Sequence, residues 1–273
     1  MIEKDEKKLA IVCSGGGMGC AYAGGVLCAL SKELHLTSPK YIITASGSAG
    51  ATLYYLTGQL SELERIWKQH LSTTKFISFA RLRRVMDIDY LVDVVFNLLE
   101  PLTISVLPGV DTQFYIPAME VSSQNVRYFS KEDNVDSFEL LRAAKALPIF
   151  YGKATPLLGG RYVDSGLVEG LDDLINKARS LNPTHVLVID VQVKAVPFLF
   201  LKRLFRHMVI KVRNDKHSKN SFTIDRPKIF TLFAKNNPAS LLTRDKRKLA
   251  ESFDLGYGDT KNNKELLSFL SNF

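Results

Sequence analysis

The sequence has few cysteines and no long apolar run. Its three cysteines, at positions 13, 20 and 28, form no C-x-x-C pair and no zinc-type spacing with histidine, so we expect reduced structural thiols. No apolar run approaches the ~20 residues that a membrane-spanning helix requires. The ends carry no recognisable secretion or lipidation signal. We therefore expect a cytosolic protein whose contact with a membrane would be peripheral.

Two absent binding motifs narrow the range of ligands that we expect. There is no D-x-D-x-D-G calcium loop and no G-K-[ST] phosphate loop, so neither a metal ion nor a cofactor is expected. The 273 residues, 46% of them hydrophobic, predict a single domain over 1–273. A net charge of +8 favours an anionic partner. A membrane surface fits better than nucleic acid, which we do not expect because no nucleic-acid motif accompanies the basic residues.

Apolar runs and turn signals alternate along most of the chain. Strands are expected at 9–13, 41–45, 113–121, 125–129, 154–158, 161–163, 185–192 and 228–234, and helices at 20–34, 138–145 and 170–181. Apolar residues at helical spacing predict a helical insertion over about 61–100, with Trp67 and His70 on its buried side. This alternation predicts a mostly parallel sheet with helices on both faces.

A glycine cluster follows the first strand. Gly15, Gly16 and Gly17 stand where that strand turns into a helix, and such a turn exposes N–H groups to an anion. A nucleotide phosphate is one candidate, but Cys20 occupies the place of the third glycine of a dinucleotide fingerprint. A transient oxyanion is the other, and it is favoured because the next strand ends in a serine turn.

That serine turn is Ser46-Gly47-Ser48-Ala49-Gly50. A β-branched run, small residues around a serine and a following helix are the layout of a nucleophile elbow. We expect Ser48 to be the exposed nucleophile, with Ser46 and Gly50 as the small residues two positions to either side.

A candidate catalytic carboxylate follows a predicted hairpin. The two-residue turn Gly159-Gly160 leads to Asp164, which is followed by Ser165 and Gly166. An aspartate after a strand is most often a cap or turn residue, and the same position would suit a catalytic carboxylate.

Taken in order, the glycine cluster, the serine turn and Asp164-Ser165-Gly166 resemble the motifs of the patatin-like phospholipase family. Gly25-Val26-Leu27, the segment from Arg142 to Pro148 and Leu255-Gly256-Tyr257 are also family-like. The resemblance implies a three-layer α/β/α sandwich that hydrolyses phospholipid or other acyl-ester lipids with a serine–aspartate dyad. It assigns Ser48 as nucleophile and Asp164 as base. Gly15, Gly16, Gly17 and Met18 then form the oxyanion hole, and Ser46, Gly50 and Gly166 support the elbow and the dyad.

One position departs from the family pattern. Gly19 stands where the family usually carries arginine or lysine after its glycines. A catalytically weakened scaffold that binds lipid or a partner is therefore the alternative function.

Two other serine-hydrolase folds fit the sequence less well. An α/β-hydrolase triad needs a histidine after the aspartate, and His185, His207 and His217 meet that order. Ser48, however, follows only the second predicted strand, and none of these histidines lies in a small-residue loop. A transacylase of related fold would need a histidine near the serine and a pocket arginine, and neither is recognisable.

A basic amphipathic segment lies at about 198–219. Its apolar residues recur at helical spacing between seven lysines and arginines. It is interpreted either as a helix lying on an anionic bilayer or as a crossover helix with a solvated basic face.

Overall fold

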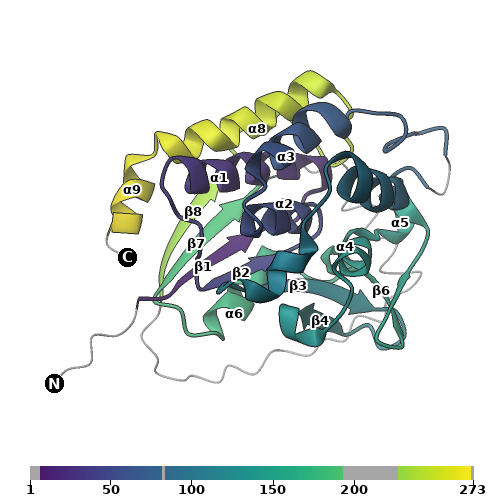
Figure 1. The fold of residues 1–273 in the computed structure, drawn as a ribbon, viewed down its shortest axis with the longest axis horizontal. Coiled ribbons are helices and arrows are strands. Elements are labelled where there is room, and N and C mark those ends of the chain that lie inside the picture. Colours follow the sequence, from purple (N-terminus) through teal and green to yellow (C-terminus); the bar gives the residue numbers. More distant parts are fainter. Residues whose placement is uncertain (1–6, 82–83, 193–226, 272–273) are drawn as a thin grey trace.

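The computed structural model describes residues 7–81, 84–192 and 227–271, which build one central sheet between helices (Figure 1). The strands are β1 (Leu9–Cys13), β2 (Tyr41–Thr44), β3 (Gln113–Glu120), β4 (Val126–Phe129), β5 (Thr155–Leu157), β6 (Gly160–Asp164), β7 (His185–Asp190) and β8 (Lys228–Phe233). Their order across the sheet is β5-β6-β3-β2-β1-β7-β8, and β4 pairs with β3 outside this path.

The register of the sheet brings distant turns to the same level. β1, β2, β7 and β8 are parallel, and Tyr115 near the start of β3 pairs with Ile43 of parallel β2. Farther along β3, Ala118 pairs with Asp164 at the end of antiparallel β6. Three residues beyond Ile43 lies Ser46, and three beyond Tyr115 lies Ala118. The end of β6 therefore arrives level with the turn that follows β2.

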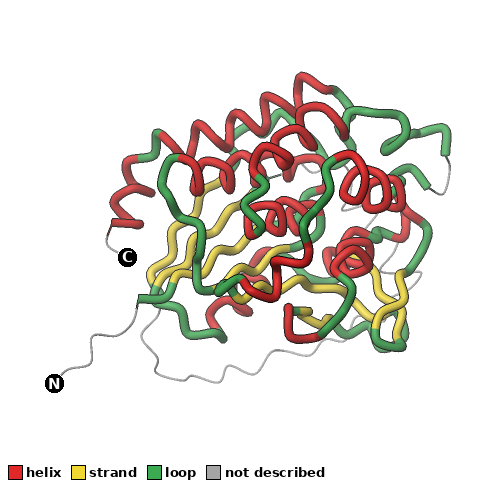
Figure 2. The backbone as a smooth tube through the Cα atoms, viewed as in Figure 1, coloured by secondary structure: helices red, strands yellow, loops and turns green. Residues whose placement is uncertain are grey.

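Helices cover both faces, which confirms the predicted three-layer α/β/α sandwich (Figures 1 and 2). One face packs under α1 (Ala21–Lys32), α2 (Gly47–Leu56) and α8 (Lys246–Lys261), and the opposite face under α6 (Leu171–Arg179). β1 alternates between them, with Leu9 and Ile11 in the larger core and Ala10 and Val12 against α6. The other α-helices of the described residues are α3 (Leu60–Arg65), α4 (Ser137–Lys145), α5 (Pro148–Tyr151) and α9 (Lys264–Ser271).

The predicted helical insertion is helical only towards its ends. After α3 come a π-helical turn, η2 (Ile66–His70), and later a π-helix, η3 (Tyr90–Leu99). Between them lies a loop with an isolated bridge between Ile77 and Met86. The N–H of Met86 donates to Phe150 O, so this stretch is paired with other parts of the chain rather than within a helix.

The hairpin forms as predicted, but with its turn shifted by one residue. Leu158 and Gly159, both with positive φ, make the turn, while Gly160 pairs with Leu157 in the ladder. Of the described residues, no helix has both the length and the apolar character to cross a membrane. The basic amphipathic segment at about 198–219 lies outside the described residues.

Candidate active site

Ser46 occupies the sharp corner between β2 and α2. Its backbone has φ 51° and ψ −125°, a strained conformation for a residue other than glycine. The corner lifts the side chain off the end of the strand, and the Ser46 hydroxyl donates a 2.6 Å hydrogen bond to Asp164 Oδ2. A serine in this conformation, in contact with a buried carboxylate, has the geometry of a nucleophile elbow.

Ser48 lies elsewhere. It is inside the first turn of α2, fully buried, and its hydroxyl donates to Ser14 O at 2.7 Å. The expected pairing of Ser48 with Asp164 is therefore wrong, because β2 ends at Thr44 and the corner comes two residues earlier than the motif suggested. Ser48 instead ties α2 to the loop after β1.

Asp164 ends β6 and is 1% exposed. The carboxylate accepts two hydrogen bonds, one from the Ser46 hydroxyl and one, at 2.9 Å, from the N–H of Gly166. Burial raises the pKa of Asp164 to about 6, and these two hydrogen bonds oppose the rise. At neutral pH the carboxylate is thus largely ionised, with a pKa suited to accepting and returning a proton.

The glycine loop lies directly against the serine corner, as the sequence predicted. A Cβ on Gly15 would lie 3.0 Å from Ser46 Cβ, and a Cβ on Gly47 would lie 2.6 Å from Gly17 O. Gly17 also has a φ of +55°. Within the described part of the chain, the N–H groups of Gly15, Gly16, Gly17 and Gly47 have no acceptor. They are donors available to an anion.

Met18 differs from these glycines. Its N–H donates to Leu241 O at 3.1 Å, so the expected contribution of Met18 to an oxyanion hole does not fit the structure. Buried Asn237 holds the same loop by donating to Gly19 O and Val191 O. The 236–243 segment thus fixes the glycine loop from behind.

Lys145, at the end of α4, is a site residue that the sequence analysis missed. Its ammonium donates to Ser46 O at 3.0 Å, and the residue is only 6% exposed. Burial lowers the pKa of Lys145 to about 8, while the negative charge of Asp164 opposes that change. The sequence marks the segment from Arg142 to Pro148 as family-like but gives no signal that singles out Lys145.

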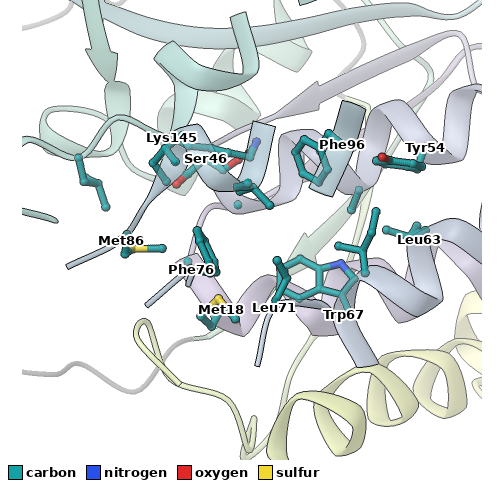
Figure 3. Close-up of a pocket in the computed structure, with 18 residues that line it drawn as sticks. Met18, Ser46, Tyr54, Leu63, Trp67, Leu71, Phe76, Met86, Phe96 and Lys145 are labelled. Atoms are coloured by element: carbon teal, nitrogen blue, oxygen red, sulfur yellow. Dashed lines mark hydrogen bonds between the residues drawn. The ribbon is translucent and has the colours of Figure 1, made fainter. Parts of the chain in front are cut away.

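An apolar pocket opens from Ser46 (Figure 3). The space between its lining atoms amounts to about 550 Å³ when open solvent at the mouth is counted. Ser46 and Lys145 lie at one end, and Tyr54, Leu63 and Trp67 lie at the other. Gly50 belongs to the wall, where a Cβ would lie 2.9 Å from Phe96, so its small size keeps room beside the serine. The shape suits a hydrocarbon chain attached to a group that reacts at Ser46.

Comparison with known proteins identifies the family. The family model described as patatin-like phospholipase matches residues 11–188, well over half of the chain. The chain belongs to the patatin-like phospholipase family. Ser46, Asp164 and the glycine loop all lie within the matched range.

Individual relatives of this patatin-like protein are distant. It is 24% identical over 172 residues to the uncharacterized protein YjjU of Escherichia coli (strain K12), covering 60% of this chain and 47% of YjjU. The chain thus spans about half the length of that curated relative. VipD from Legionella pneumophila superposes with a TM-score of 0.55 at 11% identity, over 97% of this chain and 67% of VipD. Human GIVD cytosolic phospholipase A2, solved with methyl gamma-linolenyl fluorophosphonate, superposes with a TM-score of 0.51 at 13% identity, over 97% and 58%. These two likenesses support the fold.

Proposed function

We propose that this protein is a serine lipid acyl hydrolase that cleaves the carboxylic ester of a phospholipid or related lipid. The observation that carries the proposal is the 2.6 Å hydrogen bond from the Ser46 hydroxyl to buried Asp164 at the end of an apolar pocket. Membership of the patatin-like phospholipase family supports the lipid class of substrate.

Ser46 is the proposed nucleophile. Its Oγ attacks the acyl carbonyl carbon while its proton passes to Asp164 Oδ2. The tetrahedral oxyanion accepts hydrogen bonds from the N–H groups of the glycine loop and of Gly47, which follows Ser46 at the start of α2. The positive end of that helix also stabilises the developing charge. The C–O bond to the leaving alcohol then breaks, and Asp164 returns the proton to the alcohol oxygen.

The second half-reaction regenerates the enzyme. A water molecule attacks the acyl group on Ser46 and gives its proton to Asp164. The ester bond to Ser46 breaks, and the proton returns to Ser46 Oγ, which releases the fatty acid. The apolar pocket holds the acyl chain through both steps, because 18 residues line it and nearly all are apolar or small.

Peripheral contact with an anionic membrane is the corresponding proposal for access to substrate. The net charge of +8 supports it. Vesicle sedimentation with and without anionic lipid measures this contact independently of turnover.

Fluorophosphonate labelling tests the dyad, because the reagent phosphonylates an activated serine. We expect the parent protein to be labelled and Ser46→Ala not to be labelled. Ser48→Ala is the matched control, two residues away with the same atoms removed, and it should keep most of the labelling. Hydrolysis of nitrophenyl esters of increasing chain length then reports on the pocket, and we expect longer chains to be preferred.

Two outcomes would contradict the proposal. Labelling of folded Ser46→Ala at the parental rate would remove Ser46 as nucleophile. A folded parent that resists the reagent would instead favour a scaffold that binds lipid without turnover, the alternative raised by Gly19.

A further inference from the structure

Lys145 is an unusual group for the position it occupies. Among the described residues that line the pocket it is the only one with a charged basic side chain. An ammonium has three N–H donors, and the partner of Lys145 is a single backbone carbonyl, that of Ser46. No carboxylate of the described residues forms a direct ion pair with it. The chain thus keeps a buried charge beside its candidate nucleophile.

The Lys145 ammonium has apolar residues on the pocket side and two titratable groups elsewhere around it. A Cβ on Gly50 of α2 would lie 3.7 Å from Nζ, and Phe96 of η3 packs against the same glycine. The titratable groups that face Lys145 are Asp164 of β6 and Cys20 of the turn η1 (Gly17–Cys20). Burial raises the pKa of Cys20 to about 12, so this thiol stays neutral. Asp164 is therefore the charge with which Lys145 interacts.

A purely structural role does not account for a lysine here. Burying an ammonium beside one carbonyl costs solvation free energy, and a methionine of similar length would fill the same space without that cost. The carbonyl of Ser46 already accepts the N–H of Ala49 in the first turn of α2. The position therefore needs the charge rather than the volume.

We propose that Lys145 is a positioning residue that fixes the Ser46 corner through its carbonyl oxygen and supplies the positive charge that keeps Asp164 ionised. This inference rests on the proposed serine–aspartate function and deepens it. Lys145 acts through Ser46 and Asp164, since its contact is with the backbone of one and the field of the other.

The proposal has a definite pH signature. Asp164 must be ionised to accept a proton, so labelling should rise with pH through its pKa of about 6. As pH rises through the pKa of Lys145, about 8, its hydrogen bond to Ser46 O loses the charge that strengthens it, so the Ser46 corner is held less firmly and labelling should fall there. Without the ammonium the pKa of Asp164 moves upward, because an opposite charge nearby no longer favours the carboxylate.

The test is the pH dependence of the fluorophosphonate labelling rate, measured between pH 5 and 10 on the parent and on Lys145→Met. In the parent the labelling rate rises with pH at the lower limb of the profile and falls at the upper limb. In Lys145→Met we expect the lower limb to move to higher pH by about one unit and the upper limb to disappear. Lys131→Met is the matched control, because Lys131 also donates its ammonium to a backbone carbonyl, that of Val110, outside the pocket. Its profile should coincide with that of the parent.

The outcomes separate this inference from the proposed function. A parent that is not labelled at Ser46 defeats the proposed function itself. A parent labelled at Ser46, with a Lys145→Met profile that differs only in height, overturns the role of Lys145 alone. If Lys145→Met does not fold, Lys145→Arg decides the question, because arginine stays charged over the whole pH range. The upper limb of its profile should vanish and the lower limb should remain. A profile identical to that of the parent would overturn the proposal.

Discussion

The carboxylates of Asp164 and Glu100 are both buried, yet their pKa values move in opposite directions. Glu100 receives two hydrogen bonds from the Arg65 guanidinium, at 2.7 and 2.6 Å, and lies 2.9 Å from His70 Nε2. These hydrogen bonds, from Arg65 above all, hold the pKa of Glu100 below its usual range. Asp164 has one hydroxyl, one N–H and a more distant ammonium, and burial raises its pKa to about 6.

The difference separates a structural charge from a reactive one. Glu100 follows η3 and joins it to α3 and η2, so its satisfied charge ties these three elements to one another. Asp164 is left short of partners, and its charge is therefore easily neutralised by a proton. A carboxylate that exchanges a proton near neutral pH suits catalysis, whereas a fully paired one suits architecture. Four measurements can break or sharpen this contrast, beginning with the largest expected effect.

Asp164→Asn should lower the fluorophosphonate labelling rate at pH 7.5 by about a thousandfold, within the range for loss of a general base. The amide keeps the shape of the carboxylate but cannot take the Ser46 proton. Glu100→Gln should leave the rate within about threefold, since Glu100 does not line the pocket. Equal losses in the two variants would abolish the distinction drawn between them.

Gly47→Ala should reduce labelling more than tenfold. Its Cβ would lie 2.6 Å from Gly17 O and 2.8 Å from Cys20 Sγ, so the glycine loop would have to move away from Ser46. Gly258→Ala provides the control, because no heavy atom lies within 4 Å of that Cβ. Unchanged labelling in folded Gly47→Ala would mean that the glycine loop does not supply the oxyanion donors.

Glu100→Gln should destabilise the protein at pH 7 by about 2 kcal/mol, the usual scale for hydrogen bonds to a charged group. The folded-state pKa of Glu100 lies below its unfolded value, so this stability is present above the unfolded pKa and is lost as pH falls. Urea unfolding at pH 7 and pH 4 measures it. A loss that is the same at both values would contradict the assigned pKa direction.

Asp164→Asn should raise the free energy of unfolding at high pH in the same urea experiment, whereas Glu100→Gln lowers it. The folded pKa of Asp164 is raised from 3.8 to about 6, so ionisation opposes folding above pH 6, by at most about 3 kcal/mol. Asparagine removes this cost of ionisation. Part of the gain is offset because Lys145 loses its countercharge, and we expect a net stabilisation of about 1 kcal/mol at pH 8. The gain should vanish at pH 4, where the parent carboxyl is protonated in the folded state. Destabilisation at pH 8 would show that Asp164 is a structural charge like Glu100.

Much of the fold was predictable because local patterns carry it. Alternating strands and helices predicted a mostly parallel sheet with helices on both faces, and the glycine cluster predicted a loop beside the serine turn. Local chemistry also sets the start of α4, where Asp136 caps the helix by accepting the N–H of Glu139. The loop between η2 and η3 was not predicted, because it is held by contacts with distant residues: the N–H groups of Met86 and Asp87 donate to Phe150 O and Phe76 O.

The sequence alone determined the chemical groups of this site and their order along the chain, because glycine, serine and aspartate at strand ends are local signals. The tertiary structure decided which of them act together. Two serines two residues apart satisfy nearly the same motif, and only the end of β2 and the arrival of Asp164 distinguish them. Likewise, Leu241 O accepts the N–H of Met18, and the packing of α4 buries Lys145 beside Ser46. These contacts of Asp164, Leu241 and Lys145 join residues 99 or more positions apart, and no local pattern records them.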